Sequence, residues 1–146
     1  LLENRAQELG VDLTAELSAD LPPVSLDAAG IHCCLLNLVG NAVDACRDGA
    51  GGGTDRRVVV RTLPVPGGGV EYQVADTGCG MDDNVRLRLF QSFFSTKGTE
   101  GTGIGLMVTR RIVDQHQGVI EVHSEKGRGS TFTIRLPGKA QIPESP

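Results

Sequence analysis

The sequence predicts an α+β protein in which a mixed, mostly antiparallel sheet packs against about three helices as a two-layer sandwich. Three observations support this fold. Segments in which apolar and polar residues alternate, as in strands, are interspersed with segments of helical apolar spacing. Two pairs of the strand-like segments are separated only by glycine-containing turns, which favours antiparallel hairpins. The length of 146 residues, with 39% hydrophobic and 22% charged residues, is typical of one soluble domain.

The N-terminal third contains a short helix, a strand and a long helix. Leu1–Leu9 has the pattern of the last turns of a helix, and Gly10 is suited to end it. Apolar and polar residues alternate over Val11–Leu17, which predicts a strand. Ser25 can cap a long helix from Leu26 to about Asp48.

The middle of the chain contains a hairpin followed by two helical segments. Arg57–Leu63 and Val70–Ala75 are predicted to be the strands of the hairpin. Asp82–Phe90 has the pattern of a short helix. Leu106–Gln117 is predicted to be a longer helix that Gly118 ends.

A second hairpin completes the predicted domain. Val119–Ser124 and Ser130–Leu136 are its strands, around a turn at Lys126–Gly129. Because the chain starts within a helical pattern, we expect it to be a segment of a longer protein. The predicted organisation is the end of a preceding helix or linker at 1–10, one domain at 11–137 and a flexible tail at 138–146.

Composition argues against several classes of function. The formal net charge of -4 and the lack of a basic stripe with interleaved aromatic residues argue against nucleic-acid binding. No apolar run approaches the length of a membrane span and there is no signal-peptide pattern. We therefore expect a cytoplasmic domain without direct membrane contact, although a longer parent protein could be anchored. The four cysteines form no Cys-x-x-Cys pair, which favours reduced, buried thiols over a zinc site.

Short polar side chains form a stripe on the first long predicted helix. Asn37, Asn41 and Asp44 are spaced i, i+4 and i+7, which places them on one helix face. A solvated face is the simplest explanation of most polar stripes, but such faces are usually rich in long Lys and Glu side chains. The side-chain oxygen of Asn is a hard, neutral ligand that suits Mg²⁺. We therefore expect Asn41 in particular to bind a metal ion.

Asp76 follows a strand whose inward side chains are apolar. Its carboxylate is expected to be at least partly buried, and a buried charge needs hydrogen-bond donors. Asp-Thr-Gly is good turn chemistry, so Asp76 could simply cap a turn. Alternatively, an ionised carboxylate only accepts hydrogen bonds, so it would bind the amino group of adenine and repel the carbonyl oxygen of guanine. Gly78 and Gly80 would then let the backbone approach the purine, and Met81 would give an apolar contact.

A glycine-rich segment precedes the helix predicted at Leu106–Gln117. Gly101, Gly103 and Gly105 lack Cβ atoms where a bulky anion would have to approach the backbone. A loop of this kind offers free N–H groups and the positive end of a helix dipole. Glycine loops also form ordinary turns, so the segment alone is weak evidence. Together with the polar stripe and Asp76, it predicts a nucleotide site.

Five segments occur in an order that matches known motifs: Asn37–Ala42, Asp76–Met81, Leu89–Gly98, Gly101–Leu106 and Gly127–Phe132. They are similar to the N box, first glycine box, F box, second glycine box and terminal box of the GHKL superfamily. That superfamily includes DNA gyrase B, mismatch-repair and heat-shock chaperone ATPases. Within it, the chain resembles the ATP-binding catalytic domain of bacterial sensor histidine kinases, from about Val11 to Leu136.

The resemblance implies ATP and Mg²⁺ as cofactors and assigns roles to residues. Asp76 would bind the adenine amino group with help from Gly80 and Thr131, and Asn41 would hold Mg²⁺. The second glycine box would hold the phosphates, and residues 82–100 would form a lid anchored by phenylalanines. The implied nucleotide-binding residues are Asn41, Asp44, Asp76, Gly78, Gly80, Met81, Phe90, Thr96, Gly101, Thr102, Gly103, Ile104, Gly105, Leu106 and Thr131.

Two further residues are implied to be catalytic. Lys97 would reach the γ-phosphate, although an exposed loop lysine would fit its position equally well. Asn37 would lie beside the metal, where the chaperone and gyrase branches carry a glutamate that activates water. An amide cannot take a proton, so the chain should be a poor ATPase by itself. A neutral imidazole needs no strong base, which favours transfer to histidine.

The phosphoacceptor is expected outside this sequence. His32, His116 and His123 lie outside any motif that resembles the family's acceptor site. The resemblance implies a histidine-bearing dimerisation domain of the same parent protein, dimerisation through that domain, and a response regulator downstream. A serine kinase on the same scaffold, or a module that binds ATP without transferring phosphate, are the alternatives.

Overall fold

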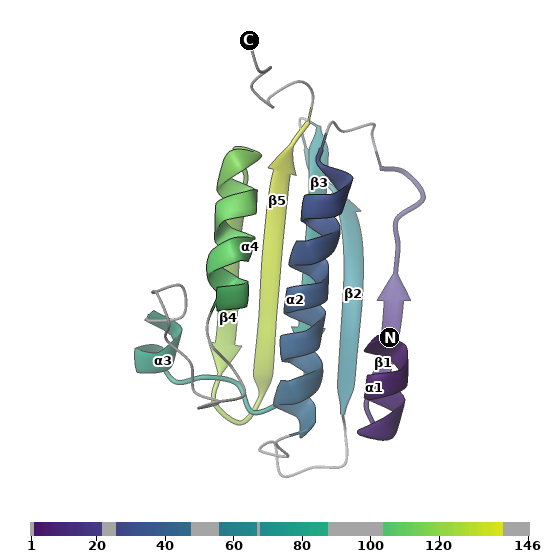
Figure 1. Ribbon diagram of the computed structural model, residues 1–146, viewed down its shortest axis with the longest axis vertical. Coiled ribbons are helices and arrows are strands. Elements are labelled where there is room, and N and C mark those ends of the chain that lie inside the picture. Colours follow the sequence, from purple (N-terminus) through teal and green to yellow (C-terminus); the bar gives the residue numbers. More distant parts are fainter. Residues whose placement is uncertain (1, 22–25, 48–55, 67, 88–103, 139–146) are drawn as a thin grey trace.

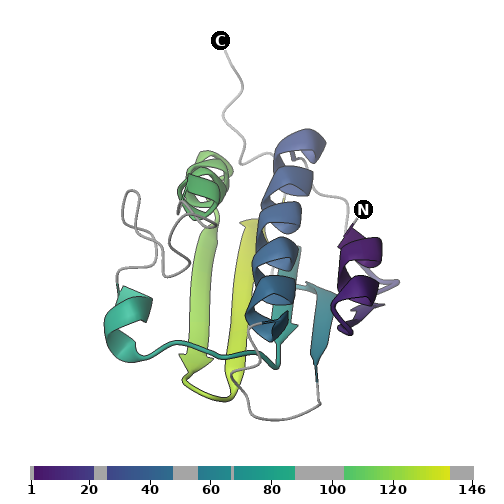
Figure 2. The same cartoon turned by 60° about the horizontal axis from the view of Figure 1, so that its bottom comes forward.

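The computed structural model describes residues 2–21, 26–47, 56–66, 68–87 and 104–138. In this part of the chain, α2 (Ala28–Arg47) and α4 (Ile104–Gln115) lie across one face of a five-stranded sheet (Figures 1 and 2). α1 (Leu2–Glu8) lies beside the C-terminal half of α2. The predicted α+β two-layer fold is confirmed.

The sheet is mixed and mostly antiparallel, as predicted. Its order is β1-β2-β3-β5-β4, in which only β1 and β2 run parallel. Both predicted hairpins are present, because β2 pairs with β3 and β4 pairs with β5. The remaining elements are β1 (Asp12–Glu16), β2 (Arg57–Pro64), β3 (Gly69–Asp76), α3 (Asp83–Leu87), β4 (Val119–Glu125) and β5 (Gly129–Pro137).

The core lies between the sheet and the two long helices. On β3, Val70 and Val74 are at most 1% exposed, whereas Glu71 between them is half-buried on the opposite face. α2 contributes Leu38 and Val43, which are also at most 1% exposed. Full burial of each such side chain contributes roughly 1.5–3 kcal/mol to the stability of the fold. Alternate side chains of β3 and the side chains on one face of α2 therefore form a single apolar layer.

One row of residues crosses the sheet near the end of β3. Asp76 pairs with Val58 on β2 and with Ser130 on β5, and Ser130 in turn pairs with Ser124 on β4. Directly opposed residues in a sheet point to the same face. The four side chains therefore share the face that α2 and α4 cover, which brings two hydroxyl groups toward Asp76.

α2 is long and apolar enough, by length and composition alone, to cross a membrane over Ala28–Cys46. The expectation that no apolar run approaches this length is therefore wrong. The apolarity has a simpler cause, because α2 is the central helix of the core. It contacts β2, β3, β5 and α4 and buries Cys34, Leu38 and Cys46.

Gly10 ends α1, as predicted. Its φ is +71°, its N–H donates to the carbonyl of Gln7 at 3.2 Å, and the Val11 N–H donates to the carbonyl of Ala6 at 2.8 Å. This pair of bonds is the Schellman arrangement, in which a residue of positive φ closes the helix. Ser25, predicted to cap α2, lies outside the described residues.

The end of α4 differs from the prediction in one respect. Gln117, not Gly118, has the positive φ, at 58°, and the Gly118 N–H donates to the carbonyl of Val113 at 2.9 Å. A Cβ at position 118 would lie 2.5 Å from the carbonyl oxygen of Arg135 on β5. Glycine is therefore required here by close packing against the sheet, which sequence pattern alone cannot distinguish from a helix stop.

Candidate functional site

The β3 end of the site consists of Asp76, the loop Thr77–Met81, and Ser124 and Ser130 on the second hairpin. Asp76 is the last residue of β3 and is 8% exposed, so its predicted burial is confirmed. Its Oδ1 accepts a hydrogen bond from the Gly78 N–H at 2.9 Å. That bond is the turn cap offered as the simpler interpretation of Asp76.

Burial removes water from the carboxyl group of Asp76 and so disfavours its charged form. Burial raises its pKa to about 6, and the backbone amides of Gly78 and Ser130 act in the opposite direction without cancelling the effect. The turn cap also leaves acceptor capacity on the second carboxylate oxygen. The turn-cap and ligand-binding interpretations are therefore compatible.

The second hairpin supports the loop after Asp76. The Oγ of Ser124 accepts the Met81 N–H at 2.7 Å and lies 2.8 Å from the Oγ of Ser130. The Gly127 N–H donates to the carbonyl of Cys79 at 2.7 Å. Sequence reasoning missed Ser124 and Ser130 as site residues. The hairpin turn indicates that Ser124 and Ser130 are paired, but their place in the row of Asp76 depends on the pairing of β3 with β5.

Gly78 and Gly80 are required by the protein's own packing. A Cβ at Gly78 would lie 2.6 Å from the backbone carbon of Ala45 on α2. Gly80 has a φ of +64°, and its Cβ would overlap the carbonyl oxygen of Glu125 in the turn of the second hairpin. Their predicted approach to a purine stays a prediction, because the observed contacts already explain both glycines. Met81 is half-buried against the core.

The predicted role of Thr131 stays a prediction, and the register of the sheet bears on it. Thr131 pairs with Ala75, one residue out of step with Asp76, so its side chain points to the sheet face opposite the helices. Ser130, the residue before it, shares the face of Asp76. Because strand side chains alternate, Ser130 is better placed than Thr131 for its side chain to face Asp76.

The α2–α4 end of the site consists of Asn37, Asn41 and Asp44 on α2 and Gly105 at the start of α4. Asn37 Nδ2 donates to the carbonyl of Gly105 at 3.2 Å and lies 3.3 Å from the Oγ1 of Thr109. The carbonyl only accepts hydrogen bonds, so it sets which end of the amide faces α4. Asn37 thereby joins the two helices.

The other two residues of the stripe have different surroundings. Asn41 is half-buried one turn from Asn37. The Oδ1 of Asp44 accepts hydrogen bonds from Arg5 of α1, at 3.2 Å from Nε and 2.7 Å from Nη2. The stripe is thus not simply a solvated face, since Asn37 engages α4 and Asp44 engages α1. Sequence reasoning missed Arg5, whose contact joins positions 39 apart in the chain.

Only part of the second glycine box belongs to the described residues. Gly105 lies against Asn37, where a Cβ would be 3.4 Å from Cγ, and Leu106 is 8% exposed. Ile104 is the first residue of α4. The other predicted site residues of this region and of the lid lie outside the described residues: Phe90, Thr96, Lys97, Gly101, Thr102 and Gly103.

The described residues suit an adenine nucleotide with a hard cation. Asp76 supplies an acceptor-only group in a buried position, and Asn41 supplies a neutral oxygen on the neighbouring helix. Gly78 connects the two, because it follows Asp76 and packs on α2 at Ala45.

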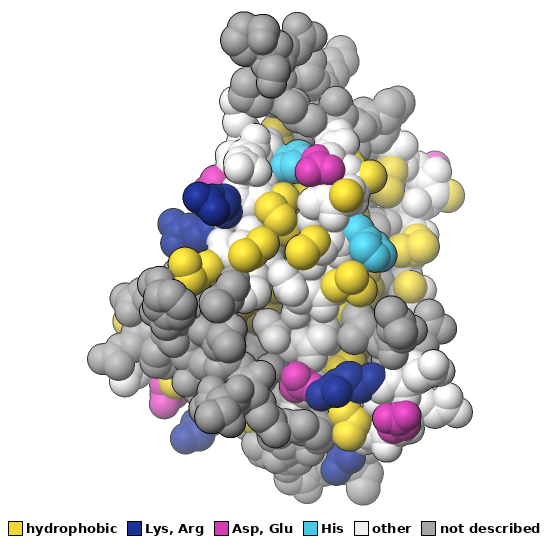
Figure 3. Space-filling view, in the orientation of Figure 1, with side chains coloured by type: hydrophobic (Ala, Val, Ile, Leu, Met, Phe, Trp, Pro, Cys, Tyr) yellow, Lys and Arg dark blue, Asp and Glu magenta, His cyan; other side chains and the backbone are white. Residues whose placement is uncertain are grey.

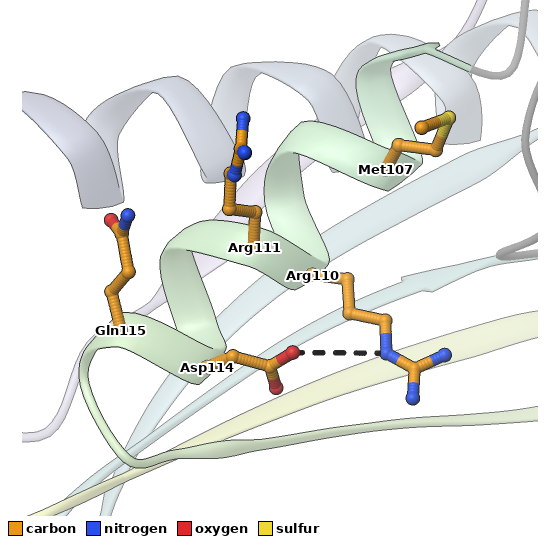
Figure 4. A pocket seen from close by; sticks show the side chains of 5 residues that line it. All are labelled: Met107, Arg110, Arg111, Asp114 and Gln115. Carbon is orange, nitrogen blue, oxygen red and sulfur yellow. Dashed lines mark ion pairs between the residues drawn. The ribbon is translucent and has the colours of Figure 1, made fainter.

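A separate hollow lies on the outer side of α4 (Figure 4). Met107, Arg111 and Gln115 point to one side of it, and Arg110 and Asp114 to the other as an ion pair with 3.9 Å between Nε and Oδ2. None of the five residues is a predicted site residue. We therefore do not assign the nucleotide to this hollow.

The sequence is similar to those of known kinases. Residues 26–140 match the model of the family described as histidine kinase-, DNA gyrase B-, and HSP90-like ATPase. The chain is 35% identical over 137 residues to the signal transduction histidine-protein kinase AtoS of Escherichia coli (strain K12), an alignment that covers 94% of this chain and 21% of AtoS. It is 37% identical over 137 residues to the sensor histidine kinase ZraS of the same organism, covering 94% of this chain and 28% of ZraS.

Two solved structures are similar across nearly the whole fold. The crystal structure of full-length ShkA in complex with AMPPNP matches with a TM-score of 0.80 and 30% identity, covering 97% of this chain and 28% of ShkA. A nucleotide-free catalytic domain of the histidine kinase ThkA matches with a TM-score of 0.77 and 26% identity, covering 94% of this chain and 86% of that domain. The chain thus spans less than a third of AtoS, ZraS and ShkA.

Proposed function

This chain belongs to the family of histidine kinase-, DNA gyrase B- and HSP90-like ATPases, and we propose that it is the ATP-binding catalytic domain of a two-component sensor histidine kinase. In the proposed reaction, the γ-phosphoryl group of ATP passes to a histidine of a dimerisation domain, for relay to an aspartate of a response regulator. The observation that carries the proposal is the buried carboxylate of Asp76, held at the end of β3 beside α2.

Asp76 would recognise the base. One of its oxygens is engaged by the Gly78 N–H, and the remaining acceptor positions suit the amino group of adenine. A carbonyl oxygen, as in guanine, would face a group that cannot donate while it is ionised. Ser130 and Ser124 would support this contact, because they hold the loop that follows Asp76.

The α2–α4 end would bind the phosphates and their metal. Asn41 would hold Mg²⁺ through its side-chain oxygen, and Gly105 would lie beside the phosphates. When bound, Mg²⁺ supplies charge neutralisation for phosphoryl transfer. The chain itself then contributes positioning, since in-line transfer to a ready nucleophile needs little else.

Asn37 supports a kinase over a hydrolase. Its amide donates to the carbonyl of Gly105 and contacts Thr109, and an amide cannot accept a proton from water at neutral pH. A glutamate at this position could act as a general base, but this chain has none there. We therefore expect slow ATP hydrolysis in the absence of an acceptor.

The acceptor histidine is proposed to lie on another segment of the parent protein. Both ring nitrogens of His116 are engaged, because Nε2 accepts the Asp27 N–H at 2.9 Å and Nδ1 lies 2.8 Å from the carbonyl of Ile112. His123 pairs with Thr131 and points to the far face of the sheet, away from Asp76. We propose that the parent protein is a dimer through its histidine-bearing domain and that the ATP-binding domain works in the cytoplasm.

Labelled ATP distinguishes the proposed function from its alternatives. The chain is mixed with a separately prepared histidine-kinase dimerisation domain, Mg²⁺ and γ-labelled ATP, and the labelled protein is tested for acid stability. Acid-labile label on the dimerisation domain supports the proposal. Acid-stable label on serine would indicate a serine kinase, and nucleotide binding without any label would indicate a nucleotide-gated interaction module.

A further inference from the structure

An ion pair links α1 to the polar stripe of α2. The guanidinium of Arg5 donates from both Nε and Nη2 to the same oxygen of Asp44, at 3.2 and 2.7 Å. The side chains of Arg5 and Asp44 are 47% and 21% exposed, so the pair lies at the surface. On the face shown in Figure 3, acidic and basic side chains adjoin near the C-terminal half of α2.

Arg5 is held at this place by the rest of α1. Its neighbour Ala6 is 1% exposed within the core, and the carbonyl of Ala6 accepts the Val11 N–H at 2.8 Å. The helix can therefore not slide along α2 without uncovering Ala6. The side chain of Arg5 reaches from this helix across to Asp44 on α2.

Asp44 lies three residues after Asn41, on the same face of α2. Side chains at this spacing have Cβ atoms roughly 5–6 Å apart. A metal-bound triphosphate held at Asn41 would thus approach a carboxylate, in a chain of net charge -4. Two like charges at such a distance repel unless a cation lies beside them.

We propose that Arg5 is a phosphate-end cation of the nucleotide site, which neutralises Asp44 and presents its remaining guanidinium donors to the phosphates. The proposal rests on the proposed nucleotide binding at Asn41. Arg suits this role because its planar group has five N–H donors, of which those on Nε and Nη2 face Asp44.

The proposal makes α1 part of the nucleotide site. Any change that withdrew Arg5 would remove its positive charge from beside Asp44 and the phosphates. The affinity for a polyphosphate would then fall, while the affinity for the base, set at Asp76, would not. This difference separates a charge effect from a general loss of structure.

The test measures the affinity of the intact chain for Mg²⁺-AMPPNP and for adenosine by calorimetry. Arg5→Gln is expected to weaken Mg²⁺-AMPPNP binding by about three- to tenfold and to leave adenosine binding unchanged, because adenosine carries no phosphate. The loss of affinity should be smaller in salt at about 0.5 M, because such a concentration screens exposed charges. The double variant Arg5→Gln/Asp44→Asn should bind Mg²⁺-AMPPNP better than Arg5→Gln, because the carboxylate no longer repels the phosphates, but more weakly than Asp44→Asn, because the guanidinium donors are lost.

Arg61→Gln is the matched control. Arg61 also forms an exposed ion pair, with 2.8 Å between Nε and the Glu16 Oε1, but on the sheet face opposite α2. It should change neither affinity. Unchanged Mg²⁺-AMPPNP binding in Arg5→Gln, or an equal loss for both ligands, would overturn the role of Arg5 alone. If the unaltered chain binds neither ligand, the proposed nucleotide site fails as well.

Discussion

The two ends of the candidate site hold their polar side chains in opposite ways. At the β3 end, Asp76 is buried in a position where ionisation is unfavourable, and burial raises its pKa to about 6. At the α2–α4 end, Asn37 is a neutral group whose donors are satisfied by Gly105 and Thr109 of the facing helix. The charged form of Asp76 therefore destabilises the ligand-free protein. The hydrogen bonds of Asn37 stabilise it.

The difference indicates which residues the fold needs and which a ligand needs. A buried carboxylate with spare acceptor capacity is unfavourable until a donor fills the position, which agrees with the binding role that we propose for Asp76. Asn37 is retained at least in part for joining α2 to α4. Substitutions at the two ends should therefore separate stability from nucleotide affinity, and the following variants test that separation.

Asn41→Ala should have the largest effect, on phosphoryl transfer. If Asn41 holds the metal, its loss should lower the rate of transfer from Mg²⁺-ATP by about a thousandfold, because a preorganised charge-stabilising group is removed. Some nucleotide binding should remain, since Asp76 is unaltered. The transfer assay with the dimerisation domain measures the effect, with Gln115→Ala on the exposed side of α4 as control. Transfer at the unaltered rate would remove Asn41 from the metal role.

Asp76→Asn should produce two opposite effects. The affinity for Mg²⁺-AMPPNP should fall by about a hundredfold, because an amide turns one acceptor into a donor against the adenine amino group. The free energy of unfolding at pH 7 should rise by up to about 3 kcal/mol, since the raised pKa of the buried acid no longer opposes folding. Calorimetry and urea unfolding measure the two quantities.

Ser130→Ala should weaken binding, whereas Thr131→Val, on the far face, should not.

The pH dependence of stability should differ between the unaltered chain and Asp76→Asn. The pKa of Asp76 in the folded protein, about 6, lies above its ordinary value of 3.8. Its contribution to stability is therefore fully present below pH 3.8 and is lost as pH rises to about 6. The stability gap between Asp76→Asn and the unaltered chain should open over this window and be constant above it. A gap that is the same at pH 3.5 and pH 7 would show that burial of the charge is not its cause.

Asn37→Ala should act mainly on stability. The substitution leaves the carbonyl of Gly105 and the Oγ1 of Thr109 without this donor, which should lower the free energy of unfolding by about 1–2 kcal/mol. Thr109 itself also donates to Gly105 at 2.8 Å, which moderates the loss. Nucleotide affinity should change less than in Asp76→Asn. If Asn37→Ala leaves stability unchanged and lowers nucleotide affinity as much as Asp76→Asn does, the contrast between the two ends of the site is wrong.

Much of this contrast could be predicted from sequence, because its elements depend on local pattern. The strands and helices follow from two-residue and helical apolar periods, and Gly10 ends α1 as its position indicates. The burial of Asp76 follows from the apolar strand before it. These features need only a few neighbouring residues to specify them.

The rest depends on contacts between distant parts of the chain. The contact of Arg5 with Asp44 and the row of Ser124, Ser130 and Asp76 require the register of the sheet and the packing of α1. The difference between Thr131 and Ser130 has the same origin, because a shift of one residue reverses the face of a strand. Gly118 shows that a glycine can be required by space rather than by its φ.

Gly105→Ala provides the smallest and most discriminating test. Unlike Gly78 and Gly80, Gly105 has no severe clash to avoid: a Cβ would meet Asn37 Cγ at 3.4 Å, which is close to an ordinary contact. Alanine should therefore raise the stability of α4 by about 0.5 kcal/mol through helix propensity. If phosphates lie beside Gly105, the added methyl group should lower Mg²⁺-AMPPNP affinity by about threefold, with adenosine unaffected. A variant that is more stable and binds both ligands normally would show that glycine at this position does not serve the phosphates.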